Sequence, residues 1–338
     1  IGGPGLAKQC LAEGSAGGPG REHGHGARLR PSEGTQDLAR GEFLSRGAIT
    51  GGTGQLAYDL HRRWNERHPA DELRLLSHQE VEVSDLASVQ RTLGALRPAI
   101  VINCSAFHKV DVVEDEVANA FAVNATGARN LALACRDLGA PLIHLSTDYV
   151  FSGRHPTPRT EDDAVDPIQV YGVSKVAGEQ LIRYLWPKHF IVRGSGLYGV
   201  AGSSGKGGNF VETMLKLAGS STSIKVVNDQ TLTPTATWFL ADQISLLATT
   251  DAYGTYHATC QGECTWYEFA GEIFRQAGLA PRVQPQTTAE SGVAATRPAY
   301  SVLENRNLKR LGLDMMPPWR EALTAYLADR KARIPASA

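Results

Sequence analysis

Short apolar runs alternate with longer amphipathic stretches from residue 46 onward. The short runs have the length of buried strands, whereas apolar residues spaced three or four apart indicate helices with one buried face. The pattern predicts strands at residues 48–50, 73–76, 99–103, 142–146, 190–193 and 224–227. It predicts helices at residues 55–68, 86–96, 118–138, 171–185, 265–277 and 319–331.

Strands that alternate with helices form βαβ units, and such units build a parallel sheet with helices on both faces. We therefore predict an α/β fold with a doubly wound, Rossmann-type parallel sheet. A smaller, mostly helical lobe is expected toward the C-terminus, because the alternation weakens from residue 251 onward. The predicted sheet domain comprises residues 46–193 and 222–250, and the predicted smaller lobe comprises residues 194–221 and 251–335.

Residues 1–45 differ from the rest of the chain. They are rich in Gly, Arg, Glu, Ser and Pro and show little apolar periodicity. Such a segment buries too little apolar surface to offset the entropy that is lost on ordering. We therefore predict a low-complexity, disordered extension that is foreign to the fold.

Charge and hydropathy exclude several classes of partner. With 34 basic and 35 acidic residues, the formal net charge is −1 and there is no long basic run, so we expect no binding to nucleic acid or to anionic membranes. No apolar stretch reaches the roughly 18–20 residues that a membrane-spanning helix requires. We expect a cytoplasmic protein.

The five cysteines do not predict a disulfide framework or a metal site. Their number is odd and they are scattered through a long chain, which is unlike a small secreted scaffold. Cys260 and Cys264 lie four residues apart, but no second pair of Cys or His follows at the spacing of a zinc site. We predict free thiols and no bound zinc.

A glycine-rich turn follows the first predicted strand. Gly51 permits a tight turn, Gly54 lets the backbone approach a pyrophosphate, and the small Ala57 permits close packing of helix and strand. The helix that follows presents its N-terminus to phosphate charge. The turn predicts a dinucleotide site in the sheet domain, with Gln55 and Leu56 as further cofactor contacts.

The second predicted strand leaves the choice between NADH and NADPH open. It ends at Leu76-Ser77-His78, without the acidic residue that favours a free ribose 2′-hydroxyl or an adjacent Arg for a 2′-phosphate. Asp85 and Leu86 follow as candidate contacts to the adenine. Capping of the next helix is an equally good role for Asp85.

Tyr171 and Lys175 stand four positions apart on a predicted helix, and Thr147 ends a predicted strand upstream. Positions i and i+4 share one face of a helix, so the phenol and the ammonium can address one ligand. A nearby cation favours phenolate, so we expect Lys175 to lower the pKa of Tyr171.

These three residue types suit the reduction of a ketone. Hydride from a nicotinamide leaves negative charge on the carbonyl oxygen, and a positioned acid must supply a proton there. Tyr171 is the candidate acid, Thr147 would donate a hydrogen bond to the same oxygen, and Lys175 could also hold the nicotinamide ribose.

With these residues in place, the chain resembles the dTDP-4-dehydrorhamnose reductases, which are extended short-chain dehydrogenases. The resemblance runs from about residue 46 to the end of the chain. Its strings occur in family order: ITGGTGQLA at 49–57, RPAIVINCSAFHKVDVVEDE at 97–116, FAVNATGARNLA at 121–132, LSTDYVFSG at 145–153, YGVSKVAGE at 171–179, RGSGLYG at 193–199, GNF at 208–210, NDQTLTPT at 228–235 and RPAYSVL at 297–303.

The resemblance implies NADPH- or NADH-dependent reduction of the C4 keto group of dTDP-4-dehydro-L-rhamnose to give dTDP-L-rhamnose. The sheet domain would bind the cofactor and the smaller lobe would bind the nucleotide sugar. A homodimer, in some relatives built around Mg²⁺, is also implied, but its ligands are not mapped onto this chain. The implied residues are Thr147, Tyr171 and Lys175 for catalysis, Ser105 and Ala106 for the cofactor, Asp148 and Tyr149 for the sugar, and Asn209 and Arg297 for the nucleotide diphosphate.

Arg297 suits a diphosphate because its planar guanidinium pairs with two phosphate oxygens. A surface salt bridge is its alternative role. Related 4,6-dehydratases place Glu after the aspartate that follows the strand-end Thr, whereas this chain has Tyr149 there. The acid/base group that water elimination needs is therefore missing.

Two alternatives stay open at this point. The family usually has Trp where this chain has Gly196, which removes an aromatic surface and leaves room for a reductase or epimerase of another nucleotide sugar. The chain also shares VDVVE at 110–114 with the methionine adenosyltransferase regulatory subunit, which resembles this family. A non-catalytic, NADP-binding regulatory subunit is therefore the second alternative.

Overall fold

The computed structural model describes residues 46–201, 208–220 and 223–333. The description below concerns the unit of the chain to which these residues belong, Leu38–Ala338. The extension predicted at residues 1–45 lies outside the described residues.

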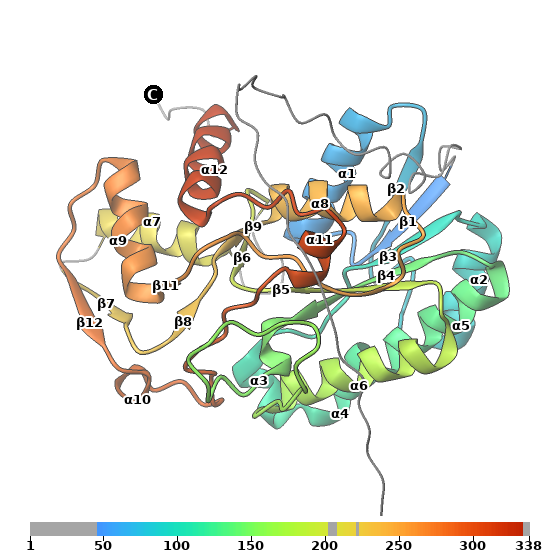
Figure 1. Ribbon diagram of the computed structural model, residues 1–338, viewed down its shortest axis with the longest axis horizontal. Coiled ribbons are helices and arrows are strands. Elements are labelled where there is room, and N and C mark those ends of the chain that lie inside the picture. Colours follow the sequence, from blue (N-terminus) through green and yellow to red (C-terminus); the bar gives the residue numbers. More distant parts are fainter. Residues whose placement is uncertain (1–45, 202–207, 221–222, 334–338) are drawn as a thin grey trace, which may run out of the picture. The chain divides into compact units, whose positions relative to one another are not determined.

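A six-stranded parallel sheet forms the centre of this unit (Figure 1). Its strand order is β10-β5-β4-β3-β1-β2. The connection direction reverses between β1 and β3, and this crevice at the carboxyl ends of the strands is where doubly wound sheets bind ligands. The strands are β1 (Arg46–Thr50), β2 (Glu72–Leu76), β3 (Ile100–Asn103), β4 (Leu142–Thr147), β5 (His189–Gly194) and β10 (Gly254–His257).

Helices cover both faces of the sheet (Figure 1). One face is covered by α1 (Gln55–Arg67) and α8 (Thr237–Ala248), and the other by α2 (Leu86–Leu96), α5 (Ala128–Leu138) and α6 (Val170–Leu185). Ile49, Ile102, Ile143 and Phe190 form one row across four paired strands and are fully buried on the α1/α8 side. Alternate positions bury on the other side, so the predicted doubly wound α/β fold is confirmed.

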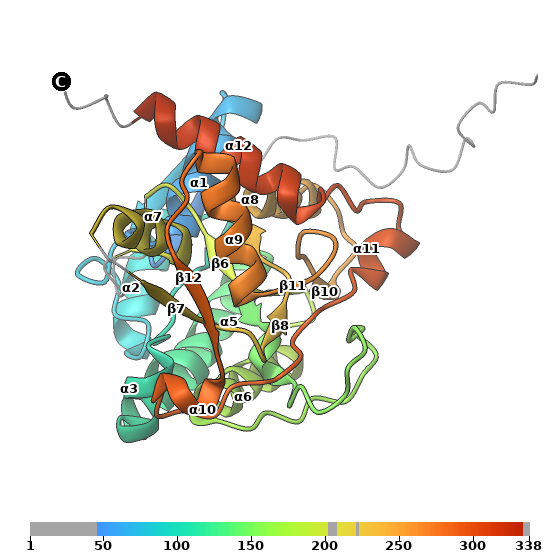
Figure 2. The same cartoon turned by 90° about the vertical axis from the view of Figure 1, so that its left-hand side faces the viewer.

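The C-terminal part adds helices and three two-stranded sheets beside the main sheet (Figure 2). Capping boxes start α9 at Thr265 and α10 at Thr287. The hydroxyl of each threonine accepts from the backbone N–H of the Glu three residues further on. The carboxylate of that Glu accepts from the backbone N–H of the threonine. The remaining elements are β6 (Leu197–Tyr198), α7 (Phe210–Ser220), β7 (Ile224–Val227), β8 (Thr231–Leu232), β9 (Thr235–Ala236), β11 (Cys264–Thr265), α9 (Trp266–Ala277), β12 (Val283–Gln286), α10 (Thr288–Ser291), α11 (Arg306–Arg310) and α12 (Trp319–Arg333).

Two strands differ from the predicted partition of the chain. Residues 224–227 form β7 as predicted, but β7 pairs with β12 and not with the main sheet. Ile224 and Val226 are buried while Lys225 is exposed, and an inner strand of a parallel sheet must be buried on both faces. The sixth strand of the main sheet is β10, which pairs with β5 although residues 251–335 were assigned to the smaller lobe.

The helix predicted at 118–138 consists of three parts. They are α4 (Val117–Phe121), a π-helical segment η1 (Ala122–Gly127) and α5. A π-helical segment holds one extra residue and is frequent at functional sites. A further short helix, α3 (Val110–Asp115), precedes α4, and the 3₁₀ turn η2 (Asp148–Val150) follows β4.

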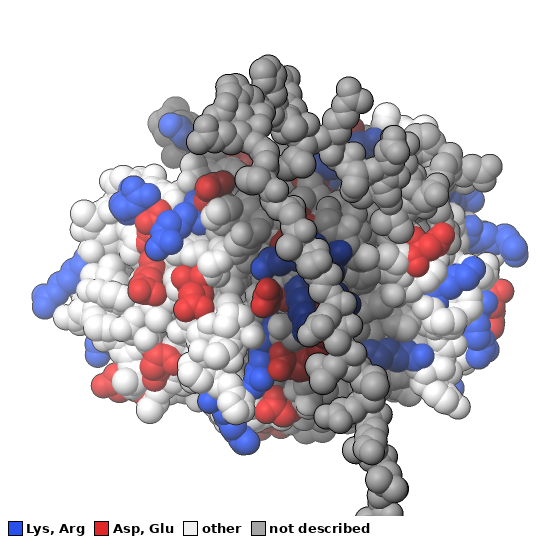
Figure 3. All heavy atoms as spheres, viewed as in Figure 1, with Lys and Arg blue, Asp and Glu red and all other residues white. Residues whose placement is uncertain are grey.

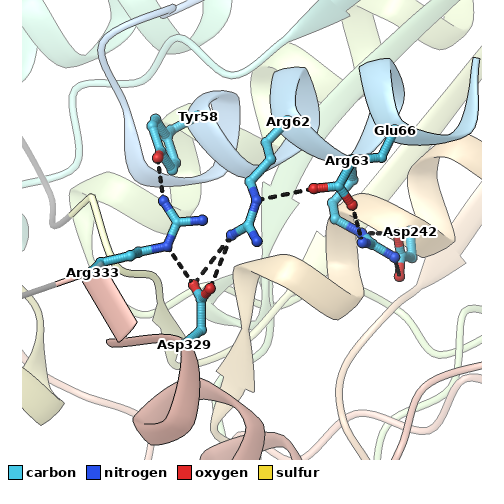
Figure 4. A network of polar contacts seen from close by, with 7 residues as sticks. All are labelled: Tyr58, Arg62, Arg63, Glu66, Asp242, Asp329 and Arg333. Carbon is cyan, nitrogen blue, oxygen red and sulfur yellow. Dashed lines mark hydrogen bonds and ion pairs between the residues drawn. The ribbon is translucent and has the colours of Figure 1, made fainter. Parts of the chain in front are cut away.

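Charged side chains connect α12 to the first helix of the sheet domain (Figure 4). Arg62 on α1 bonds both carboxylate oxygens of Asp329 on α12 at 3.2 Å. Arg63 binds Asp242 on α8 at 2.8 and 3.0 Å. The guanidinium groups of both arginines also lie over the ring of Trp238, at 4.3 and 4.5 Å from its centroid. The C-terminal helix is therefore fixed against the second half of α1.

Asp59, on α1, interacts electrostatically with Arg62 and Asp329 of this network. It is 2% exposed and accepts from the Thr237 hydroxyl. Burial raises its pKa from 3.8 to about 6, although Thr237 and Arg62 oppose the shift. A carboxyl with a raised pKa in the folded protein stabilises the fold below about pH 4, and that contribution is lost as the pH rises through about 6. We expect that in D59N the free energy of unfolding does not fall in this way as the pH rises, because asparagine does not titrate.

The free energy of unfolding of D59N should therefore rise relative to the unsubstituted protein by up to about 3 kcal/mol between pH 4 and 7. Urea unfolding at several pH values measures the difference. D137N is the matched control, since Asp137 is exposed and pairs with its neighbour Arg136. A flat difference for D59N across this range contradicts the prediction.

Three properties of the described residues bear on partners and ligands. Basic and acidic side chains are interspersed on the face shown in Figure 3, where grey atoms do not cover it. Among the described residues, no helix has the length and apolar character needed to cross a bilayer. Across the same residues, no group of three or more His, Cys, Asp or Glu is placed to hold a metal ion.

Candidate active site

A cleft of about 350 Å³ opens at the carboxyl ends of β1, β3 and β4. This volume lies in the range of small-molecule sites. The sheet domain contributes the β1–α1 turn, the residues after β3 and β4, and α6. The opposite wall comes from the start of α7, from β8 and from α9. The residues of that wall are Asn209, Phe210, Gln230, Thr231, Leu232 and Trp266.

Gly51 forms the tight turn after β1 as predicted. Its φ is +71°, a left-handed conformation that side chains disfavour. A Cβ atom at this position would lie 2.7 Å from the backbone carbon of Cys104 and from the backbone nitrogen of Ser105. Only glycine therefore allows the β1–α1 turn to approach the end of β3 so closely.

The N-terminus of α1 is suited to a bound anion. Gly54 is the N-cap and provides no side-chain cap, so the first N–H groups of the helix are left for a ligand. Gln55 donates to the Leu197 carbonyl at 3.2 Å, and its buried Oε1 has no partner within the described residues. Gly54, Gln55 and Leu56 line the cleft, which fits a dinucleotide.

We expect G51A to weaken dinucleotide binding by about tenfold or more, because the left-handed φ and the contact with the Cys104 backbone each cost about 1 kcal/mol or more. Titration of the protein with NADPH and NADH measures the affinity. G94A is the control, since Gly94 lies within α2 with no atom within 4 Å of an added Cβ. Unchanged affinity in G51A contradicts the prediction.

Thr147 and Asp148 form a hydrogen-bonded unit at the end of β4. The Thr147 hydroxyl donates to Asp148 Oδ1 at 2.9 Å and accepts from the Tyr149 amide at 3.2 Å. Ser195 Oγ donates to Asp148 Oδ2 at 2.8 Å. These contacts fix the hydroxyl of Thr147 at the cleft wall.

Tyr171 enters the same cleft from the first turn of α6. Loss of hydration raises its pKa and the nearby charge of Asp148 adds to the rise, whereas a hydrogen bond with Thr147 lowers it. The predicted direction, a pKa lowered by Lys175, is therefore the opposite of the one in the structure. The phenol therefore keeps its proton at ordinary pH.

Lys175 lines the cleft one helical turn beyond Tyr171 but is directed at the backbone of β4. Its Nζ donates to the Leu145 carbonyl at 2.6 Å and lies 3.3 Å from His144 Nε2. Burial lowers the pKa of Lys175 to about 8, although the charge of Glu179 opposes this. The lysine is thus held by β4, which explains why it does not stabilise the phenolate of Tyr171.

The π-helical segment η1 connects two parts of the sheet-domain wall of the cleft, which the sequence pattern did not reveal. Asn124 accepts from the Phe107 amide at 2.9 Å and donates to the Phe107 carbonyl at 3.0 Å. It also donates to Ser174 Oγ at 3.0 Å, and Ser174 in turn donates to the Tyr171 carbonyl at 2.7 Å. The extra residue of η1 thus connects the loop after β3 to the helix of Tyr171.

Other predicted cofactor residues are divided between the cleft and its surroundings. Ala106 lines the cleft, and Ser105 lies behind it, where its amide donates to Asn103 at 2.9 Å. Asp85 caps α2 through the Ala87 amide at 3.0 Å, which is the capping role left open above. Asp85 and Leu86 are not part of the cleft wall.

The predicted substrate residues are also divided. Asp148, Tyr149 and Asn209 line the cleft, and Asn209 additionally caps α7 through the Glu212 amide at 3.0 Å. Arg297 instead donates to Asp111 at 2.7 Å, which is the salt-bridge alternative. The roles of these residues toward substrate stay predictions.

At position 196, where the family usually has a Trp, the structure shows Gly196 with Leu232 beside it. Gly196 has a φ of +56°, and a Cβ there would lie 2.7 Å from Leu232 Cδ1. Leu232 therefore occupies the space beside the glycine. Aromatic surface comes from the other side, where Phe210 and Trp266 line the cleft with ring centroids 4.6 Å apart; neither was predicted from the sequence.

A glycine turn at a doubly wound crevice, with a tyrosine and a strand-end threonine at the same cleft, defines a Rossmann-type oxidoreductase. Comparison with known proteins identifies the family. Residues 46–332 match the family model described as RmlD substrate binding domain. The chain belongs to this family, that of the dTDP-4-dehydrorhamnose reductases, and the resemblance found in the sequence is confirmed.

The similarity to individual relatives extends over nearly the whole length of each relative. The chain is 41% identical to the dTDP-4-dehydrorhamnose reductase of Streptomyces griseus over 82% of this chain and 92% of that protein. It is 40% identical to the spore coat polysaccharide biosynthesis protein SpsK of Bacillus subtilis over 86% of this chain and 99% of that protein. The solved structure of the dTDP-4-dehydrorhamnose reductase of Bacillus anthracis in complex with NADP is 39% identical in sequence. It superimposes with a TM-score of 0.81 over 85% of this chain and 100% of that chain.

Proposed function

We propose that this protein reduces the C4 keto group of dTDP-4-dehydro-L-rhamnose to give dTDP-L-rhamnose, with NADPH or NADH as the hydride donor. The observation that carries the proposal is that Thr147, Tyr171 and Lys175 line the same cleft as the glycine turn after β1. The named reductases among the relatives support the choice of substrate.

The side chains supply what a ketone reduction needs from a protein. When bound, a reduced nicotinamide would supply hydride for the carbonyl carbon, and the carbonyl oxygen would then need a proton from the protein. Tyr171 keeps its proton at neutral pH because its pKa is raised, so it can donate to that oxygen. The Thr147 hydroxyl can give a second hydrogen bond there if it turns its single proton away from Asp148 Oδ1, and Ser195 would remain as a donor to the Asp148 carboxylate.

The cleft also fits the cofactor and a nucleotide sugar. Phosphate charge is attracted by the open N-terminus of α1, and the free Oε1 of Gln55 can accept a hydrogen bond from the dinucleotide. Phe210 and Trp266 provide apolar surface for a sugar or base on the opposite wall. The predicted cytoplasmic location and homodimer stay predictions.

The experiment is a turnover assay of the full chain with dTDP-4-dehydro-L-rhamnose and each reduced cofactor. Loss of nicotinamide absorbance and the appearance of dTDP-L-rhamnose, identified by NMR, support the proposal. No oxidation of either cofactor with this substrate, in protein that binds them, overturns it.

A different dTDP-linked 4-keto sugar is the second candidate. It is favoured by the cleft wall at Gly196, where Leu232 fills space beside the backbone. A panel of dTDP- and UDP-linked 4-keto sugars in the same assay distinguishes the two by kcat/KM. The regulatory-subunit alternative predicts instead that affinity capture returns a methionine adenosyltransferase and that no sugar in the panel is turned over.

A further inference from the structure

The C-terminal helix α12 binds the first turn of α7 through one carboxylate. Tyr326 Oη donates to Glu212 Oε1 at 2.6 Å, and Arg330 Nε donates to the same oxygen at 2.7 Å. Tyr326 and Arg330 stand four positions apart, so they share one face of α12. Glu212 belongs to the first turn of α7. Two helices that are distant in the sequence are therefore joined at this carboxylate.

The Tyr326 hydroxyl also contacts Asn209, which caps α7. Asn209 Oδ1 accepts from the Glu212 amide at 3.0 Å, and a backbone N–H can only donate, so the orientation of the side-chain amide is fixed. Its NH₂ group donates to the Gly199 carbonyl at 2.7 Å and, over a longer distance of 3.4 Å, to Tyr326 Oη. The hydroxyl of Tyr326 thus gives its single proton to Glu212 and offers a lone pair to Asn209.

Burial strengthens this link. Tyr326 is 6% exposed and Asn209 is 8% exposed. Burial, and after it the hydrogen bond with Glu212, raise the pKa of Tyr326, so the phenol keeps its proton and remains the donor. A hydrogen bond to an ionised acceptor is about twice as strong as one between neutral groups. The ring of Tyr326 also packs edge-on against Tyr198, with centroids 5.1 Å apart.

The helix that carries Tyr326 is anchored independently of α7. Asp329 on α12 accepts from Arg62 on α1 at 3.2 Å, and Arg333 on α12 donates to the Tyr58 hydroxyl on α1 (Figure 4). These contacts use a neighbouring face of α12. Tyr326 therefore holds the start of α7 from a support that α1 keeps in place.

The first turn of α7 carries two residues of the cleft wall. Asn209 and Phe210 line the wall opposite the sheet domain, and the ring of Phe210 lies 4.6 Å from that of Trp266 between centroids. Tyr326 itself is not part of the cleft wall. A shift of this turn would move the surface opposite Tyr171, whereas the glycine turn after β1 would stay where it is.

We propose that Tyr326 is a positioning residue for the wall of the cleft that faces the keto sugar. Through Glu212 and Asn209, its hydroxyl fixes the first turn of α7 and with it the ring of Phe210. As far as the sugar is concerned, the inference rests on the proposed function. The hydroxyl acts on sugar binding through α7 and leaves the cofactor site unchanged.

The first test needs neither cofactor nor substrate. Y326F keeps the aromatic ring and loses only the hydroxyl. The backbone amides of Glu212 and Thr213 both donate to Asn209, at 3.0 Å, so their hydrogen exchange in the full chain, followed by NMR, reports on this turn. We expect exchange about three- to tenfold faster in Y326F, the equivalent of one lost hydrogen bond.

Y58F is the matched control. It removes another tyrosine hydroxyl that α12 contacts, through Arg333, but it leaves the contacts of α7 unchanged. E212A removes the acceptor from the other side and should speed exchange at Thr213 to a similar extent, which keeps the test decisive if Y326F does not fold. Unchanged exchange in a folded variant, or equal acceleration in Y58F, overturns the proposal.

Steady-state kinetics test the consequence for the cleft. In Y326F, KM for the keto sugar should rise about three- to tenfold, while kcat and the affinity for the reduced cofactor stay within about twofold. A general loss of structure would instead lower kcat and cofactor affinity together. An unchanged KM in Y326F, or an equal fall in cofactor affinity, contradicts the proposal. If exchange in α7 responds as expected but the unsubstituted protein reduces no keto sugar, the proposed function fails and the role of Tyr326 in holding α7 stands.

Discussion

Y171F should lower kcat for ketone reduction by about 10²–10⁴-fold, which is the usual contribution of a positioned general acid. The substitution removes the phenolic proton that the carbonyl oxygen receives, while the ring and its edge contact with Tyr149, at 6.2 Å between centroids, remain. Cofactor affinity should change little, because the glycine turn and the N-terminus of α1 are untouched.

The measurement is steady-state turnover with the reduced cofactor and the keto sugar, together with a direct titration of cofactor binding. Y184F is the matched control, since Tyr184 stands on the same helix and is 86% exposed. If Y171F retains more than about a tenth of the activity of Y184F, the phenol is not the proton donor.

E179Q should destabilise the protein by about 3–5 kcal/mol, the usual cost of leaving a buried charge without its partner. Glu179 is fully buried on α6 and binds Arg193 on β5 through both oxygens, at 2.7 and 3.0 Å. Arg193 is itself 2% exposed, so the substitution leaves a guanidinium without a countercharge where water is excluded.

Urea unfolding at pH 7 measures this loss. E72Q is the control, because Glu72 pairs with Arg46 at the surface and such pairs contribute only about 0–1 kcal/mol. Burial would raise the pKa of Glu179, but Arg193 and Arg183 outweigh it and lower it to about 2. The contribution is therefore present above about pH 4.5 and lost as the pH falls toward 2. Equal effects of E179Q and E72Q at pH 7 contradict the prediction.

The sequence predicted the parts of the fold that depend on local pattern. Strands buried on both faces, such as those ending at Thr50 and Thr147, appear as continuous apolar runs, and the glycine turn marks its own position through the constraint at Gly51. The spacing of Tyr171 and Lys175 placed both at one cleft because a helix has a fixed period.

What could not be predicted depends on contacts between distant segments. The alternation of buried and exposed residues at 224–227 argues locally against an inner strand, but the partner strand of 224–227 and that of 254–257 depend on the packing of distant segments. Arg297 pairs with Asp111, which is 186 positions away. The orientation of Lys175 toward Leu145 and His144 likewise follows from the packing of α6 on β4. The sequence could not show this packing, so the predicted lowering of the Tyr171 pKa was wrong.

The extra residue in η1 sets the direction in which the side chain of Asn124 points relative to α4 and α5. A regular α-helix over the same residues would point it elsewhere. Removing one residue from 122–127 would let the backbone return to regular i to i+4 bonding and so gain local order. The same deletion would rotate Asn124 by about 100° about the helix axis and release both Phe107 and Ser174. Deletion of one residue in this stretch should therefore be tolerated by the helix while it inactivates the cleft.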